Sequence, residues 1–375
     1  MHADERLLPD SKTHLQGLIG KEKYPIAYKF QIQNLQKDKK TILMSDGHRL
    51  FTNYKDIYFS GRIHEQISPS LKEIGGEIRE SNVNLLHLGY SYTGEKEKQK
   101  NDRNRYLLKK MVKEEPENAY AHYTLGQFFA LNGKHNQAIK HYKKAYQLHQ
   151  LPADMTVSLL NVMAEELFKV KDLHTCQKYV EKSIDKVKTQ VGGYYLLYKL
   201  AEHRKEYSRA IQHLNKILIN SAIINKSGKQ ISTDVIIEKD RVLFTIANLY
   251  YKQKNRELAY KNFVQAYSYN NKSNYLKKAF QLAIELGDSK KFESLFELQT
   301  SFDQKDIHFL HNIGINLIKK GFHKFALKSY KSILNIEPNN RLALKRAAGL
   351  YAKLSNRKKA AQLVHKLQNL SKSAQ

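Results

Sequence analysis

The sequence predicts a mainly α-helical protein in which an array of paired helices follows a smaller segment of mixed strands and helices. Three observations lead to this prediction. Six prolines and 17 glycines are few for 375 residues, whereas an all-β fold needs many turns. Apolar residues alternate with a period of two before residue 95. After it they follow a helical period, and whole units recur every 34 residues.

The first 95 residues contain nearly all the recognisable strands. Aromatic and β-branched residues alternate with polar ones over 26–32, and short apolar runs occupy 41–44 and 48–51. Beyond them, 95–105 is charged and has no apolar period. We therefore expect an exposed helix over 96–118 to connect the two parts of the chain.

The remainder, 119–375, repeats itself. Units that begin at Ala119, Asp240, Ile307 and Arg341 place small residues at positions 8 and 20, and large apolar residues at positions 11 and 24. Position 7 is also large and apolar in the first three of these units and is Ala347 in the last. A unit that begins at Val157 matches loosely, and 194–218 and 275–298 keep only part of the pattern. Small residues let the two helices of a unit approach where they cross. The intervening 220–239 has no such pattern and is predicted to be a surface insertion.

This pattern resembles the tetratricopeptide repeat (TPR), a 34-residue helix–turn–helix, and it predicts about six to seven units. Pro338, at position 32 of its unit, ends the second helix because proline has no N–H and crowds the preceding turn. The resemblance implies an α-solenoid whose concave groove binds a protein or peptide partner. No residue of the repeat framework carries chemistry.

Residues 1 to about 110 contain an ordered set of short motifs. The set comprises Asp4-Glu5, then Arg49-Leu50-Phe51, then Gly61-Arg62-Ile63-His64-Glu65, and finally His87-Leu88-Gly89-Tyr90. This order resembles the second half of a family 2 glycosyltransferase with a GT-A fold, of the subgroup that carries TPR units after its catalytic domain. The resemblance implies an incomplete α/β domain over 1–95 and an ancestral transfer of sugar from a nucleotide-sugar donor to an acceptor.

The resemblance also assigns roles to residues. Asp4 matches the metal-binding Asp of the DxD element, which holds Mn²⁺ or Mg²⁺ against the donor diphosphate, and His2 takes the place of the first Asp. Glu65 is the candidate general base, and His64 is a candidate metal or diphosphate contact. His87 is a candidate on the acceptor side.

The chain departs from this family in two ways. His2 is a poorer ligand for a hard cation than a carboxylate, and the nucleotide-binding half that precedes DxD in the family is missing. We therefore expect either a truncated gene product or a chain that pairs with a separately encoded nucleotide half. By itself the chain is expected not to catalyse and to act through its repeats.

Each candidate residue also has a purely structural interpretation. His64 and Glu65 could form an ordinary ion pair at a strand edge, and Asp4 could be solvated charge. His87, among leucines, could be a hydrogen-bonded core histidine. His308 and His311 are spaced to share a metal ion, but no third ligand is evident.

The net charge of +28, with a pI of about 9.7, admits a nucleic-acid partner through phosphate contacts. The joint abundance of Lys, Asn, Ile and Tyr is equally typical of AT-rich codons, and an acidic partner is a further alternative. A single cysteine, Cys176, excludes a disulfide framework. No apolar run reaches the ~20 residues of a membrane span, and no secretory signal is evident, so we expect a cytoplasmic protein.

Overall fold

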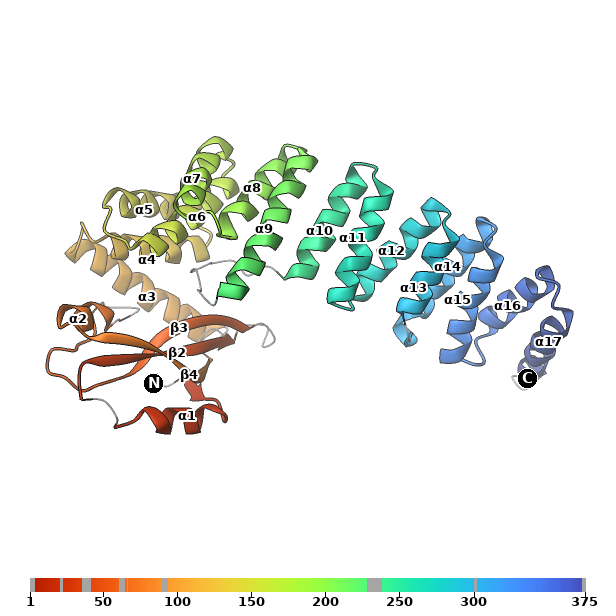
Figure 1. The fold of residues 1–375 in the computed structure, drawn as a ribbon, viewed down its shortest axis with the longest axis horizontal. Coiled ribbons are helices and arrows are strands. Elements are labelled where there is room, and N and C mark those ends of the chain that lie inside the picture. Colours follow the sequence, from red (N-terminus) through yellow and green to blue (C-terminus); the bar gives the residue numbers. More distant parts are fainter. Residues whose placement is uncertain are drawn as a thin grey trace. The chain divides into compact units, whose positions relative to one another are not determined.

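A computed structural model describes 4–20, 23–35, 42–60, 65, 67–88, 94–227, 238–299 and 302–372 (Figure 1). The chain divides into two compact units, Met1–Asp172 and Leu173–Gln375. Helices dominate both units, which confirms the mainly α-helical prediction. No helix among the described residues is long and apolar enough to cross a membrane.

The first unit combines a sheet with helices. Its elements are β1 (Glu5–Leu7), α1 (Ser11–Leu18), β2 (Ile26–Leu35), β3 (Ile42–Phe51), α2 (Ser68–Glu73), β4 (Glu77–His87), α3 (Glu95–Glu114), α4 (Ala119–Leu131), α5 (His135–Gln147) and α6 (Ala153–Lys169). The strands expected at 26–32 and 41–51 are therefore present, and a helix occupies most of the expected connector.

The four strands lie in the order β1-β4-β2-β3. β1 is antiparallel to β4 and β2 is antiparallel to β3, whereas β2 and β4 are parallel. The two short apolar runs at 41–44 and 48–51 belong to one strand, β3, because β2 pairs with it along almost its whole length, from Ala27↔Phe51 to Leu35↔Ile42. Parallel pairing of β2 with β4 brings together residues about 50 positions apart, such as Asn34 and His87.

Both faces of this sheet are covered. Ile26, Tyr28 and Phe30 of β2 are buried on one face, together with Leu15 and Leu18 of α1. Successive side chains of a strand point to opposite faces. Ala27 accordingly packs on the other face, in a cluster with residues in and just before α2.

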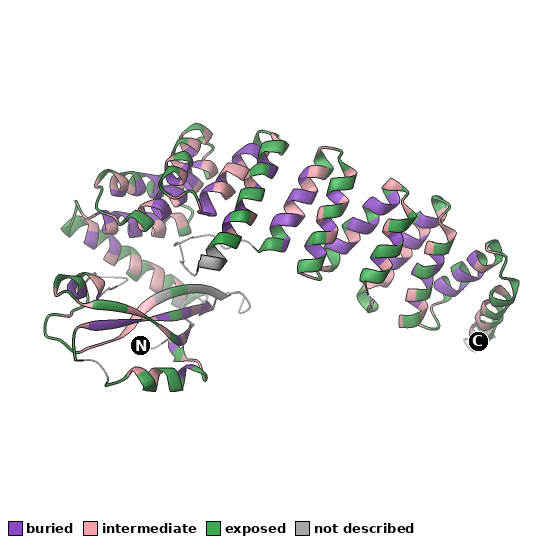
Figure 2. Cartoon of the chain, viewed as in Figure 1, coloured by how far each residue is buried: buried purple, intermediate pink, exposed green. Residues whose placement is uncertain are grey.

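The second unit is wholly helical among its described residues. Its elements are α7 (Leu173–Lys186), α8 (Gly192–His203), α9 (Tyr207–Ser227), α10 (Lys239–Lys252), α11 (Arg256–Tyr269), α12 (Ser273–Leu286), α13 (Ser289–Leu298), the 3-10 turn η1 (Gln304–Asp306), α14 (Ile307–Lys319), α15 (His323–Ile336), α16 (Arg341–Lys353) and α17 (Arg357–Lys372). From α8 onward the helices pair in sequence order. A single buried cluster runs from Leu243 to Leu350, so neighbouring hairpins share one core (Figure 2).

Close crossing of the two helices depends on the residue at position 8 of each unit. A Cβ built on Gly126 would lie 2.5 Å from Tyr142 Cε1, and one on Gly314 would lie 2.7 Å from Tyr330 Cζ. Both distances are far below carbon–carbon contact. The tyrosine at position 24 therefore packs directly on the glycine backbone of the first helix, as the repeat pattern predicts.

The turn between the two helices of a unit needs a left-handed residue at position 15. Gly133 (φ 69°) and Gly321 (φ 82°) supply it in two units, whereas Lys171 (φ 66°), Lys254 (φ 61°) and Ser355 (φ 61°) supply it in others. Non-glycine residues adopt this conformation with strain.

The predicted surface insertion over 220–239 is wrong in its first part. Helix α9 continues to Ser227, and Asn220 is buried within it. The Asn220 amide Nδ2 donates to the carbonyl oxygens of Gln190 at 3.0 Å and Lys188 at 3.3 Å. These bonds satisfy carbonyl groups of the preceding turn, which keeps the helix in contact with its neighbour. The segment 228–237 lies outside the described residues.

Candidate functional site

Two of the predicted site residues meet at one end of the sheet. Asp4 directly precedes β1, and His87 ends β4, where it pairs with Glu5 of β1. Asp4 Oδ2 lies 3.1 Å from His87 Nε2, and the backbone N–H of Leu88 donates to the Asp4 carbonyl at 2.9 Å. The antiparallel pairing of a short edge strand thus brings Asp4 against the imidazole.

The row of polar groups continues across the sheet to β2 and β3. His87 Nδ1 lies 2.8 Å from Asn34 Oδ1, and Asn34 Nδ2 donates to Ser45 Oγ at 2.8 Å and to the Ile32 carbonyl at 3.2 Å. Asp4, His87, Asn34 and Ser45 therefore come from, or directly adjoin, all four strands. Sequence reasoning missed Asn34 and Ser45; the only signal was a polar residue near the end of an apolar strand.

The bonds of this row fix the orientation of the Asn34 amide. A carbonyl oxygen only accepts, so the Asn34 amide nitrogen faces Ile32 and its oxygen faces His87. Both ring nitrogens of His87 therefore lie against an oxygen atom, Nδ1 against Asn34 Oδ1 and Nε2 against Asp4 Oδ2. This hydrogen-bonded arrangement is consistent with the structural interpretation of His87.

A buried ion pair lies beside this row. The Glu5 carboxylate is 2% exposed, and Arg49 contacts it through Nη2 at 2.8 Å and Nε at 3.1 Å. The fork geometry suits a guanidinium opposite a carboxylate. This pair joins β1 to β3 and explains the Arg49 of the second motif as structural. Of the two adjacent acidic residues Asp4 and Glu5, only Asp4 is therefore partly exposed to solvent.

The other predicted residues are not brought into this row. Glu65 is exposed on the segment that leads to α2. His2 and His64 lie outside the described residues. Among the residues that the structure does describe, no group of three or more His, Cys, Asp or Glu side chains could hold a metal ion. The prediction that Asp4 and His2 bind a metal ion stays a prediction, because His2 lies outside the described residues.

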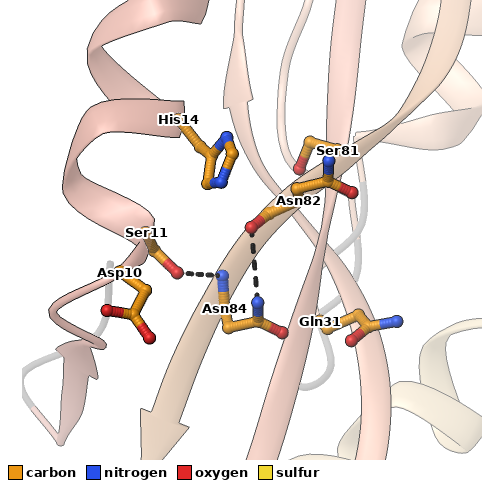
Figure 3. Close-up of a pocket in the computed structure, with 7 residues that line it drawn as sticks. All are labelled: Asp10, Ser11, His14, Gln31, Ser81, Asn82 and Asn84. Atoms are coloured by element: carbon orange, nitrogen blue, oxygen red, sulfur yellow. Dashed lines mark hydrogen bonds between the residues drawn. The ribbon is translucent and has the colours of Figure 1, made fainter.

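A separate polar hollow of about 320 Å³ lies between α1 and the face of β2 and β4 (Figure 3). It is lined by Asp10, Ser11, His14, Gln31, Ser81, Asn82 and Asn84. Ser11 Oγ accepts a hydrogen bond from the Asn84 backbone N–H at 2.8 Å, and Ser81 Oγ donates to the Lys29 carbonyl at 2.7 Å. The first bond joins α1 to β4, and the second joins β4 to β2. Part of the polar lining therefore stabilises the fold.

The second unit exposes a polar face along the first helices of its hairpins. Thr245 and Asn248 on α10 are half-buried, and Asn312 on α14 and Lys345 on α16 are exposed. The apolar residues of the same helices pack inside the shared core. The first helices α10, α14 and α16 therefore each contribute polar residues outside the shared core, an arrangement suited to an extended ligand.

Comparison with known proteins identifies this array. The tetratricopeptide repeat family matches residues 197–375. The helical hairpins over these residues are therefore similar to tetratricopeptide repeats. The family match does not reach 1–196, so the resemblance of the first 110 residues to a glycosyltransferase stays a prediction. No curated protein sequence matches the chain.

Several solved structures are similar to the chain. MamA is 20% identical with a TM-score of 0.39, covering 49% of this chain and 98% of MamA. The C-terminal part of a TPR repeat-containing protein from Cytophaga hutchinsonii is 15% identical with a TM-score of 0.46, covering 67% of this chain and 95% of that protein. The pilF protein of Pseudomonas aeruginosa is 15% identical with a TM-score of 0.30, and the match covers 58% of this chain and 93% of that protein.

Two histidines of the repeat domain, His308 and His311, do not form a metal site. His308 Nδ1 lies 3.2 Å from Asn312 Nδ2, and the His311 ring packs edge-on against Tyr330 with centroids 5.6 Å apart. Burial lowers the pKa of His311, a hydrogen bond from its ring to Asn340 opposes this shift, and the charges of Arg346 and His308 lower the pKa further. His311 therefore belongs to the helix packing, next to the cations of α16.

A buried charge links two successive hairpins of the repeat domain. Asp240 is 4% exposed, and its Oδ2 accepts hydrogen bonds from Lys272 Nζ and from the Tyr275 hydroxyl, both at 2.8 Å. Burial opposes ionisation, but these two hydrogen bonds outweigh it and lower the pKa of Asp240. This network holds α10 against the start of α12 and therefore stabilises the packing of two successive hairpins.

Proposed function

We propose that the repeat domain binds a polypeptide partner along the exposed face of its first helices. The observation that carries this proposal is the stacking of successive hairpins on one continuous core, which leaves the polar sides of α10, α14 and α16 exposed. A solenoid of this kind contacts ligands over an extended surface rather than in a closed pocket. The family match over 197–375 supports the same function.

Site-specific photo-crosslinking tests this proposal. A crosslinking residue is placed at Thr245 or Asn312 on first helices, and at the exposed Lys261 (α11) or Lys324 (α15) on second helices as matched controls. In a lysate of the source cells, the first pair should give a discrete adduct that the second pair lacks. Equal labelling from both pairs, or no adduct from any, would show that this face does not recognise a partner.

As a second candidate, we propose that the sheet of the first unit belongs to a divided glycosyltransferase. The contact between Asp4 and His87 favours it, because the family resemblance names both residues and their side chains lie 3.1 Å apart. In this proposal a separately encoded polypeptide supplies the nucleotide-binding half, and the chain by itself does not catalyse. A divalent cation would neutralise the donor diphosphate, and Glu65 would act as the base.

Calorimetry tests this second candidate. The chain alone should not bind a UDP-sugar in the presence of Mn²⁺. Adding the product of the reading frame directly upstream should create binding, and Asp4→Asn should abolish it. Micromolar binding by the chain alone would refute the divided arrangement, and binding unaffected by Asp4→Asn would refute the assigned role of Asp4.

A further inference from the structure

The last hairpin of the repeat domain has an unusual charge. Between Pro338 and Gln375 the sequence contains nine Lys or Arg and no Asp or Glu. About a tenth of the chain therefore carries about a third of its net charge of +28. Drift in codon usage would spread lysine along the chain, and it does not by itself remove every carboxylate from one hairpin.

Ion pairing separates this hairpin from the earlier ones. Lys252 pairs with Glu202, Arg256 with Glu285, and Lys328 with Glu293. In contrast, no carboxylate among the described residues pairs with the Lys and Arg residues of α16, or with those of α17 up to Lys366. These cations are thus available to an external anion without first breaking an internal pair.

The cations of α16 gather on one side of the helix. At about 100° per residue, Arg341, Lys345, Arg346 and Lys353 fall within an arc of about 140°. All four are exposed, and the other exposed residues of this arc are Leu342, Gly349 and Ala352. We call these seven residues the α16 face. It contains no uncharged polar side chain, unlike an ordinary solvated helix surface.

Gly349 lies in the middle of this face and has no structural explanation within the described chain. A glycine inside a helix costs about 1 kcal/mol relative to alanine. Gly126 and Gly314 are required because a tyrosine ring packs on each, but a Cβ built on Gly349 would meet no atom within 4 Å. Its φ is that of an ordinary helix. The absent side chain leaves space for a ligand to approach the helix backbone between Lys345, Arg346 and Lys353.

We propose that the α16 face binds an acidic polypeptide segment whose backbone passes over Gly349. Carboxylates of the segment pair with Lys345, Arg346 and Lys353, and an apolar side chain contacts Leu342, which is 49% exposed. This inference rests on the proposed function, and it names the chemistry of the partner and the hairpin that recognises it.

Two other anionic partners fit the face less well. Single-stranded nucleic acid needs exposed aromatic rings for stacking. The α16 arc has none, since Tyr351 is half-buried with Lys331 and Lys359 against its ring. A membrane-binding helix needs a broad apolar side. On α16 the apolar side is buried, and Leu342 is the one large apolar residue of the exposed arc.

Fluorescence anisotropy of the full chain tests the proposal. The probe is a short fluorescein-labelled peptide rich in Glu and Leu, and its control replaces every Glu by Gln. The Glu peptide should bind and the Gln peptide should not. Lys345→Glu combined with Arg346→Glu should weaken binding by about tenfold or more. Lys143→Glu, an exposed cation of α5, is the control, and it should change the affinity by less than about twofold.

Gly349→Ala separates recognition from stability. The variant should raise the melting temperature of the repeat domain, because alanine is the better helix former, and it should nevertheless weaken peptide binding. A residue with a merely structural role would not change stability and affinity in opposite directions. Unchanged affinity in Gly349→Ala would overturn the approach of the partner backbone to Gly349.

Competition assigns the class of partner. The competitors are an oligothymidylate and phosphatidylserine vesicles. The polypeptide assignment would be overturned if either competitor displaced the peptide, bound more tightly than it, and lost affinity to the same extent in the double variant. Absence of peptide binding, or an equal loss in Lys143→Glu, would overturn the site itself. If crosslinking from Thr245 and Asn312 still yields a partner in that case, the proposed function stands and only this inference fails.

Discussion

Replacing Gly314 by alanine should destabilise the repeat domain although alanine favours helices. The new methyl group would lie 2.7 Å from Cζ and 2.8 Å from Cε2 of Tyr330. Carbon atoms normally approach to about 3.5 Å, so the overlap at the closest contact is about 0.8 Å. The Tyr330 ring cannot rotate away because it is 0% exposed. Overpacking of this kind costs up to about 3 kcal/mol, and the helix-propensity gain offsets about 1 kcal/mol, which leaves a loss of about 2 kcal/mol.

Urea unfolding of the full chain, followed by far-ultraviolet circular dichroism, measures this loss. The matched control is Gly349→Ala, which makes the same chemical change in α16 with no atom within 4 Å of the new methyl group, and which should gain about 1 kcal/mol. Combining Gly314→Ala with Tyr330→Leu should recover part of the loss. If Gly314→Ala is as stable as the unchanged chain, the explanation of position 8 by close ring contact is wrong.

Three further predictions concern stability. Lys254→Gly should stabilise the repeat domain by about 0.5–1 kcal/mol in urea unfolding, since φ is 61° there; a loss would show that the lysine side chain matters more than the backbone. Asp240→Asn should cost about 1–3 kcal/mol, because Lys272 and Tyr275 lose a charged acceptor in a buried site; no change by thermal melting would contradict this. Burial and the neighbouring His122 lower the pKa of His141 to about 4, so the unfolded chain takes up the proton first, and stability should fall as the pH drops from about 6.5 towards 4. In His141→Gln, midpoints measured across that range should depend less on pH, and an unchanged slope would refute the assignment.

Local spacing was enough to predict the helical hairpins. The small residue at position 8 and the tyrosine at position 24 of one unit are 16 residues apart, and they meet because both lie within one hairpin. Contacts of this short range follow from the helix period. The same reasoning failed at Asn220, whose helix continues because its side chain caps a turn in the preceding hairpin. That partner lies 30 residues earlier and leaves no periodic signal.

The candidate site in the sheet could be predicted only in part, because its residues come from strands far apart in the chain. Asp4 and His87 were named through a resemblance, and the structure places them in contact. Their neighbours Asn34 and Ser45 were not foreseen, because the register between parallel strands joins residues 53 positions apart. The proposed catalytic role of Glu65 remains a prediction, as do those of His2 and His64, and so does the glycosyltransferase origin of the first 95 residues.

Local periods and composition along the chain were sufficient to predict the mainly helical architecture, the repeat spacing and the concentration of positive charge after Pro338. They also predict the tyrosine ring over Gly314, which occupies position 8 of its unit, whereas Gly349 occupies position 9. The tertiary structure was needed to show that the two ring nitrogens of His87 lie against Asp4 and Asn34, and that no atom of the described chain packs over Gly349. The contacts of His87 depend on pairing between strands that are far apart in the chain, and such pairing leaves no local period.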